Sequence, residues 1–93
     1  MIAADARPRL APKVRLRLDA KSGRFMLLYP ERGMVLNPTA AEIVKRCTGE
    51  LTVTEIIAQL AEQYAAQSRE AIEREVVEFL DAMTDRGLVR SEP

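Results

Sequence analysis

Residues 33–49 read GMVLNPTAAEIVKRCTG, and the hydrophobic pattern changes from that of a strand to that of a helix within this stretch. Three consecutive apolar residues at 34–36 predict a short strand. Asn37 is a favoured N-cap, and Pro38 suits the first position of a helix. Apolar residues then recur at helical spacing until Gly49, a helix-ending residue. These residues are Ala40, Ile43, Val44 and Cys47. The stretch therefore predicts a strand followed directly by an amphipathic helix.

Two further strands are predicted before this one. Residues 13–18 alternate strictly between apolar and charged side chains, which indicates a half-buried strand with a cationic outer face. Residues 25–29 are all apolar or aromatic, which is typical of a central strand covered on both sides. Turns at 20–23 and 30–33 are short, so the three strands should form an antiparallel meander with the third strand at an edge.

Two more helices are predicted after Gly49. Thr52 and Glu55 have the spacing of a capping box, and Ser68 can cap a third helix over residues 69–86. The core face of this third helix is expected to consist of Ile72, Val76, Phe79, Leu80 and Met83. The fold class is therefore α+β: a winged-helix-like domain in which a three-stranded antiparallel meander precedes a three-helix bundle.

The first twelve residues contain Pro8 and Pro12 and show little periodicity. They are expected to form a flexible N-terminal arm, and residues 13–93 a single winged-helix-like peptide-recognition domain. No hydrophobic core of a signal peptide precedes this domain, and no apolar run approaches the ~20 residues that cross a membrane. We therefore expect a cytoplasmic protein without a membrane partner.

The residue inventory argues against catalysis. The 93 residues include no His and one Cys, so the usual general base, the commonest metal ligand and a Cys-rich cluster are all missing. Cys47 lies on the apolar face of its helix and is expected to be a small buried hydrophobe. We expect no catalytic residue, no metal site and no cofactor, and a binding protein rather than an enzyme.

The zero net charge is divided unevenly along the chain. Residues 1–24 hold seven basic and two acidic residues, whereas residues 50–93 hold four basic and ten acidic ones. The third helix alone has six acidic and three basic residues, which disfavours insertion into a DNA groove. Nucleic-acid binding stays an alternative, because winged helices often bind DNA. Dimerisation through the apolar second strand and the exposed edge is another.

Peptide binding fits the predicted edge strand better, because an extended peptide can add to such an edge through main-chain hydrogen bonds. A mixed stripe of polar and apolar residues on the third helix, beside its core face, could form the second wall of a peptide groove. The simpler interpretation is that Val77 in this stripe is an isolated surface valine. The stripe consists of Arg69, Glu73, Val77, Leu80 and Thr84.

The chain resembles the pyrroloquinoline quinone (PQQ) biosynthesis protein D family, PqqD. The similar stretches keep their order over nearly the whole chain and differ mainly in loops. They are RPRLAPKVRL at 7–16, MLLYPE at 26–31, VLN at 35–37 with AAEI at 40–43, CTGE at 47–50 with TV at 52–53, and FL at 79–80 with GLV at 87–89.

The resemblance implies a peptide chaperone and recognition element for ribosomally made, modified peptides. Such a chaperone binds the precursor peptide PqqA and presents it to the radical S-adenosylmethionine (SAM) enzyme PqqE, which joins a Glu and a Tyr side chain. It further implies that the peptide adds beside the third strand and against the third helix. The peptide-binding residues expected here are Gly33, Met34, Val35, Leu36 and Asn37, with Arg69, Glu73, Val77 and Leu80 added from helical phase.

Overall fold

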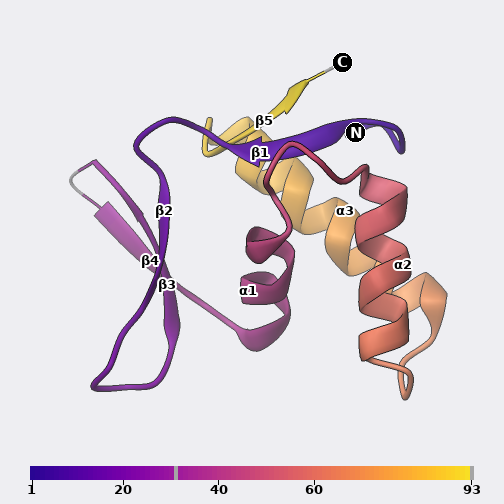
Figure 1. Ribbon diagram of the computed structural model, residues 1–93, viewed down its shortest axis with the longest axis horizontal. Helices are drawn as coiled ribbons and strands as arrows, with labels where there is room; N and C mark the ends of the chain where they lie inside the picture. Colours follow the sequence, from indigo (N-terminus) through magenta and orange to yellow (C-terminus); the bar gives the residue numbers. More distant parts are fainter. Residues whose placement is uncertain (31, 93) are drawn as a thin grey trace.

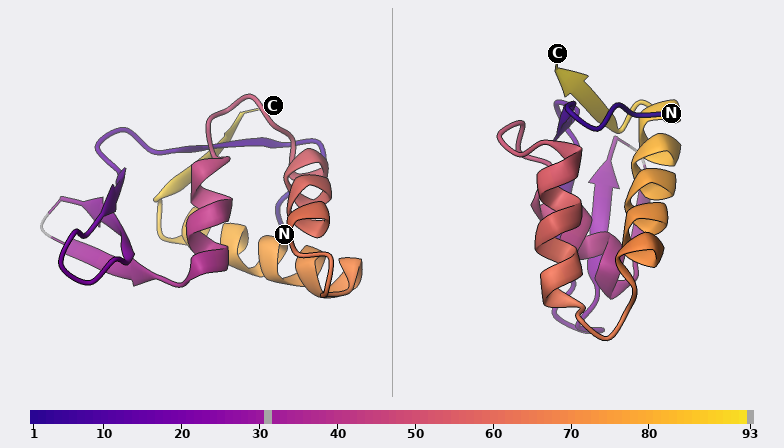
Figure 2. Two further views of the ribbon diagram at one scale, coloured as in Figure 1. Left: turned by 60° about the horizontal axis from the view of Figure 1, so that its bottom comes forward. Right: turned by 90° about the vertical axis from the view of Figure 1, so that its right-hand side faces the viewer.

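A computed structural model describes residues 1–30 and 32–92. A three-stranded sheet lies on one side of the molecule, three helices lie on the other, and a small two-stranded sheet joins the ends of the chain (Figure 1). Figure 2 shows α2 and α3 side by side, with the three-stranded sheet behind them. The elements are β1 (Arg7–Leu10), β2 (Arg15–Leu18), β3 (Phe25–Tyr29), β4 (Arg32–Leu36), α1 (Pro38–Lys45), α2 (Val53–Gln63), α3 (Arg69–Asp85) and β5 (Val89–Glu92). The predicted α+β, winged-helix-like class is confirmed.

The three-stranded sheet has the order β2-β3-β4, and both of its pairings are antiparallel. β3 is the central strand, as its continuous apolar sequence predicts, and Leu27 at its middle is fully buried. β4 pairs with β3 on one side only, so the prediction that the third strand is an edge is also confirmed. The sheet therefore presents β2 and β4 as its two edges.

The N-terminal residues differ from the predicted flexible arm. Residues 7–10 form β1, which pairs antiparallel with β5 at the other end of the chain. The Leu10 N–H donates to the Cys47 carbonyl at 3.2 Å, and the Ala11 N–H donates to the Leu88 carbonyl at 2.9 Å. Sequence pattern misses this strand because it is short, contains a proline, and has a partner some eighty residues away. The packed domain therefore begins before residue 13.

The three helices begin at the predicted caps. The Asn37 Oδ1 atom accepts the Ala40 N–H at 2.8 Å, and Ser68 Oγ accepts the Ala71 N–H at 3.1 Å. Thr52 and Glu55 form both hydrogen bonds of the capping box. α1 ends at Lys45, before Gly49, because Arg46 takes the C-cap position. Local sequence therefore places the helix starts more accurately than this helix end.

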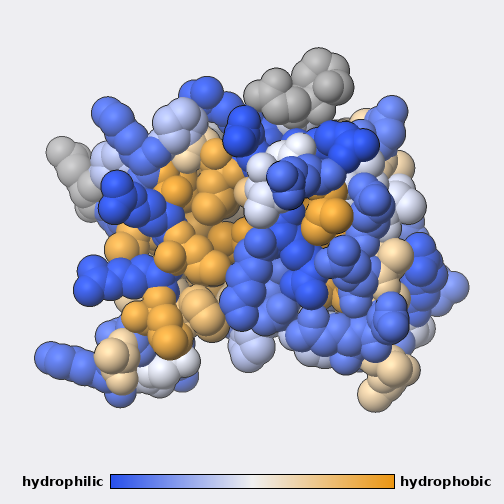
Figure 3. Space-filling view, viewed as in Figure 1, coloured by the Kyte–Doolittle hydropathy of each residue, from blue (hydrophilic) through white to orange (hydrophobic). Residues whose placement is uncertain are grey.

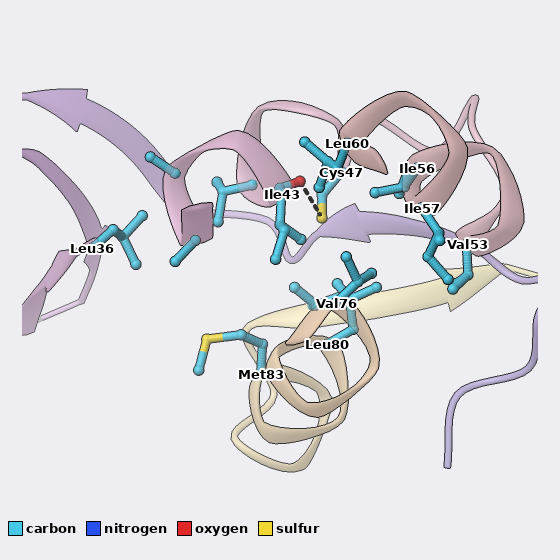
Figure 4. Packing of buried hydrophobic residues seen from close by; sticks show 14 of the residues in the cluster. Leu36, Ile43, Cys47, Val53, Ile56, Ile57, Leu60, Val76, Leu80 and Met83 are labelled. Atoms are coloured by element: carbon cyan, nitrogen blue, oxygen red, sulfur yellow. Dashed lines mark hydrogen bonds between the residues drawn. The ribbon is translucent and has the colours of Figure 1, made fainter. Parts of the chain in front are cut away.

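The main core lies between α1, α2 and α3 and continues to β3 and β5. Figure 4 shows Val76 and Leu80 pointing from α3 toward the side chains of α1 and α2. Leu80 is completely buried, whereas Phe79 is half-buried at the margin of the core. The core axis of α3 therefore runs through Ile72, Val76, Leu80 and Met83, with Phe79 to one side.

Cys47 belongs to this core, as its position on the apolar face predicts. Its thiol donates to the Ile43 carbonyl at 3.3 Å, the contact drawn as a dashed line in Figure 4. Burial raises the pKa of the Cys47 thiol to about 12, because the thiolate would lose its hydration. The side chain acts as a small apolar residue at neutral pH. None of the described helices combines the length and the apolar character needed to cross a membrane.

Candidate peptide-binding groove

The free edge of β4 exposes main-chain groups that the register identifies. The Asp19 N–H donates to the Arg24 carbonyl, so this pair is a hydrogen-bonded pair of the β2–β3 hairpin. Because such pairs alternate along an antiparallel ladder, Phe25 turns its N–H and C=O toward Leu36 of β4. The next residue of β4, Val35, then turns its N–H and C=O away from β3. Val35 offers these groups to an added strand.

The side chains of β4 divide between the two faces of the sheet. Leu36 is buried and Met34 is half-buried on the face toward the helices, opposite Phe25 and Leu27 of β3. Val35 lies on the outer face and is 52% exposed. Gly33 is exposed and, two residues from Val35, also turns its main-chain groups outward. The strand therefore combines an anchored inner face with a free hydrogen-bonding edge.

One side of α3 faces the end of β4. A surface depression of about 290 Å³ is lined by Asn37, Ala40 and Ile43 on one wall and by α3 on the other. The α3 wall consists of Glu75, Glu78 and Phe79. Phe79 and Glu75 are half-buried and Glu78 is exposed. An apolar ring with two carboxylates beside it thus lies next to the C-terminal end of the edge strand.

Arg86 joins the other end of α3 to the sheet. Its Nη2 donates to the Tyr29 hydroxyl at 2.8 Å, and its Nη1 lies 3.7 Å from the sulfur of Met34. The guanidinium carbon is also 5.8 Å from the centre of the Tyr29 ring, within the range of a cation–π interaction. These contacts hold the C-terminal end of α3 beside the end of β3 and the middle of β4. We call the surface between β4 and the Glu75–Arg86 side of α3 the β4–α3 groove.

The expected contacts at Arg69, Glu73 and Val77 lie on another side of α3. They line a separate depression of about 200 Å³ together with residues of α2 and with Met1, Ile2 and Ala4. The Ile2 N–H donates to Asp81 Oδ1 at 2.6 Å, which fixes the N-terminus over this surface. The structure therefore does not bring these three residues together with β4.

Leu80 is the remaining expected contact, and it is 0% exposed. Its side chain packs inside the core, so it is not available to a peptide on the surface of the described fold. The sequence places Leu80 in both the core face and the mixed stripe, and the structure assigns it to the core alone.

Another depression, of about 810 Å³, lies where the sheet meets α1. Phe25, Leu36 and Ala41 supply apolar lining, and Tyr64 closes one side. Figure 3 shows apolar side chains gathered over the sheet and its border with α1, whereas α1 and α2 present mostly hydrophilic side chains. This apolar surface adjoins the C-terminal end of β4, like the smaller depression lined by α3.

Charged side chains of α1 hold this border in place. Lys45 Nζ lies 4.5 Å from the centre of the Phe25 ring and 2.9 Å from Glu42 Oε2. Arg46 binds the other Glu42 oxygen at 2.9 Å and also reaches Gln59 and Gln63 of α2. Hydrogen bonds from Lys45 and then Arg46 lower the pKa of the Glu42 carboxyl. The network joins α1 to β3 and to α2.

Comparison with known proteins assigns the family. The model of the family "Coenzyme PQQ synthesis protein D (PqqD)" matches residues 24–89. The chain belongs to the PqqD family. This match includes β3, β4 and all three helices, and so it includes both walls of the β4–α3 groove. The resemblance noted in the sequence is thereby confirmed.

Individual relatives support the same assignment. A protein of Methylococcus capsulatus named "PqqA binding protein" is 35% identical over 81 residues, which cover 87% of this chain and 84% of that protein. A protein of the same name from Rhodopseudomonas palustris strain BisB5 is 35% identical over 88 residues, covering 95% and 85%. The PqqD part of Methylobacterium extorquens PqqCD, solved by NMR as a stand-alone recognition element for ribosomally made, modified peptides, superposes with a TM-score of 0.77. The two chains are 30% identical, and the superposition covers 94% of this chain and 90% of the PqqCD part.

Four residues of the β4–α3 groove were not expected from the sequence: Glu75, Glu78, Phe79 and Arg86. The signal was available in the helical phase of α3. Ile72, Val76, Leu80 and Met83 form a continuous i, i+4, i+8, i+11 series, which makes Phe79 the large apolar residue displaced from the core axis. The stripe expected from helical phase therefore lies on a different flank of α3 from Phe79.

Proposed function

We propose that this PqqD-family protein is a peptide chaperone of PQQ biosynthesis that binds the precursor peptide PqqA as an added strand on β4. It then presents the peptide to the radical SAM enzyme PqqE for cross-linking of a Glu and a Tyr side chain. The chain acts in the cytoplasm, where the precursor is made, and as an adaptor without catalysis of its own. The names of the relatives, PqqA binding protein, support the peptide partner.

The observation that carries this proposal is the unpaired edge of β4 next to a groove wall on α3. Main-chain groups of Gly33 and Val35 supply hydrogen bonds that do not depend on peptide sequence. Side chains of the peptide that point toward the helices meet Phe79 and the depression at Asn37. This arrangement gives affinity from the backbone and selectivity from α3.

The test is an NMR titration of the ¹⁵N-labelled chain with synthetic PqqA from the same organism. We expect the largest amide shifts at residues 33–37 and 75–86. Shifts centred on residues 1–4, 69, 73 and 77 would instead favour the other flank of α3 and would contradict the groove. Shifts confined to β2 would contradict strand addition at β4.

Two proline substitutions make a matched pair for this test. Val35→Pro removes an outward N–H from the β4 edge, and Leu18→Pro removes the equivalent outward N–H from the β2 edge. The two side chains are 52% and 53% exposed, and neither N–H belongs to the β2-β3-β4 ladder. The Val35→Pro variant should bind PqqA about tenfold more weakly, because it loses one main-chain hydrogen bond and its proline ring clashes with the added strand. Leu18→Pro should bind like the unmodified chain, and equal affinities would reject the β4 edge.

Presentation to PqqE is tested separately. PqqE should cross-link the Glu and Tyr side chains faster in PqqA bound to the chain than in free PqqA, as measured by mass spectrometry. Val35→Pro should abolish most of this increase at limiting peptide. A second copy of the chain on the same edge is the competing occupant. Light scattering with increasing PqqA would then report dissociation of a dimer, whereas a monomer at all peptide concentrations argues against self-pairing.

A further inference from the structure

The two ends of the β4–α3 groove carry opposite charge. At the end near Asn37, the α3 wall presents the carboxylates of Glu75 and Glu78. At the other end, the Arg86 guanidinium lies against Tyr29 and Met34. Arg32 begins β4 opposite Tyr29 and adds a second positive charge there. Phe79 lies between the two charged ends in sequence and contributes an apolar side chain to the wall.

The spacing of these charges matches the repeat of an extended peptide. Eight residues separate Glu78 from Arg86, which corresponds to about 12 Å along a helix. Side chains on one face of a strand recur every second residue, and four residues of strand span about 13 Å. A peptide strand on β4 would therefore bring two of its helix-facing side chains, four residues apart, to the two charged ends.

We propose that the groove selects extended peptides that carry a basic side chain for Glu75 and Glu78 and an acidic side chain, four residues away, for Arg86. This inference rests on the proposed function and adds the charge pattern that the peptide must carry. An antiparallel arrangement, like the other pairings of this sheet, places the basic residue before the acidic one. The opposite charges fix the register as well as the direction, because a shift by one residue turns both side chains away from α3.

The test measures PqqA affinity by fluorescence anisotropy at 50 mM NaCl with charge-reversed proteins. We expect Glu75→Lys/Glu78→Lys to weaken binding at least fivefold, because two attractive charges become repulsive beside the bound peptide. The control is Glu50→Lys/Glu62→Lys, which makes the same change in net charge at exposed positions outside the groove. It should alter affinity less than twofold. The difference between the two variants should shrink at 500 mM NaCl.

Arg86 has its own pair of variants, because it also holds α3 to the sheet. Arg86→Glu should weaken binding at least fivefold, whereas Arg86→Lys keeps the charge and should stay within about threefold of the unmodified chain.

Circular dichroism melts identify any variant that has lost its fold. If Glu75→Lys/Glu78→Lys is unfolded, the exposed single variant Glu78→Lys replaces it. Rescue is the positive result: PqqA with its basic residue changed to Glu should bind Glu75→Lys/Glu78→Lys more tightly than it binds the unmodified chain.

The outcomes separate the charge pattern from the proposed function. If Val35→Pro weakens PqqA binding while both groove variants bind like the control, the charge pattern is wrong and the β4 site stands. If PqqA fails to bind the unmodified chain, or Val35→Pro has no effect, the proposed function itself fails and the inference fails with it. Preference of the unmodified chain for PqqA with its two charges exchanged would also overturn the inference.

Discussion

Leu80→Ala should destabilise the fold without removing a peptide contact. The Leu80 side chain is 0% exposed and packs in the cluster between the three helices. Truncation to Ala removes the equivalent of three buried methylene groups, or about 2.4 kcal/mol at roughly 0.8 kcal/mol each. The cavity left behind adds to this loss, so we expect a decrease of about 3 kcal/mol in the free energy of unfolding.

The assay is urea denaturation followed by far-ultraviolet circular dichroism. With an m-value of about 1–1.5 kcal/mol per molar urea for a chain of this size, the midpoint should fall by about 2–3 M. The melting temperature should fall by at least about 12 °C, because 1 kcal/mol corresponds to roughly 4–8 °C in a small domain. Arg74→Ala, an exposed substitution on the same helix, should change stability by less than about 0.5 kcal/mol.

The result that would refute this reasoning is a stable Leu80→Ala variant that binds PqqA poorly. A loss below about 1 kcal/mol, together with a tenfold weaker affinity, would place Leu80 on the binding surface. PqqA binding is therefore measured at a temperature where the variant is still folded. An unchanged affinity for the folded fraction is the expected outcome.

Further predictions concern other parts of the chain. Cys47 should resist maleimide at pH 8 in the folded chain and react after denaturation, because burial raises its pKa to about 12; rapid native labelling would contradict the core position. Thr52→Ala should cost about 0.5–2 kcal/mol in thermal melts, because the hydroxyl that accepts the Glu55 N–H is lost. Hydrogen bonds from the Thr52 backbone N–H and from its side chain lower the pKa of Glu55 from 4.5, so this contribution is full above pH 4.5 and is lost as pH falls below it; a Glu55→Gln variant whose melting temperature falls just as steeply in acid would disprove that link. Deletion of residues 1–10 should lower the melting temperature by about 10 °C, since β5 loses its partner; an unchanged melt would show that β1 contributes nothing. Val77→Asp should leave PqqA affinity within about twofold, because Val77 faces the N-terminal residues rather than β4; a larger loss would restore the other flank of α3 as the site.

Much of the fold was predictable because the relevant signals are local. Asn37, Thr52 and Ser68 each lie a few residues from the N–H groups that they cap, so helix starts depend on neighbouring residues alone. The hairpins of β2, β3 and β4 likewise follow from short turns and a period of two. The β1–β5 pair was missed because each strand has four residues and their pairing joins opposite ends of the chain.

The candidate site was predictable only in part. The edge position of β4 follows from strand order, which short connections determine. The position of the α3 wall does not follow from the sequence. Two flanks of an amphipathic helix border its apolar stripe, and the sequence alone does not say which flank meets the sheet. Arg86 joins this flank to the sheet through contacts with Tyr29 and Met34, which lie more than fifty residues away in the chain.

The sequence alone indicates the three helices and their starts, the three-stranded meander, the lack of His, and a resemblance that names the family. These properties depend on composition, on local periodicity and on short-range hydrogen bonds. Tertiary packing alone establishes that Val77 lies beside the N-terminal residues and that Leu80 lies inside the core. It also brings Glu75, Glu78 and Phe79 to a depression shared with Asn37, next to the end of the edge strand. The physical reason is that packing fixes the rotation of α3 about its axis, and this rotation depends on every element that touches the helix.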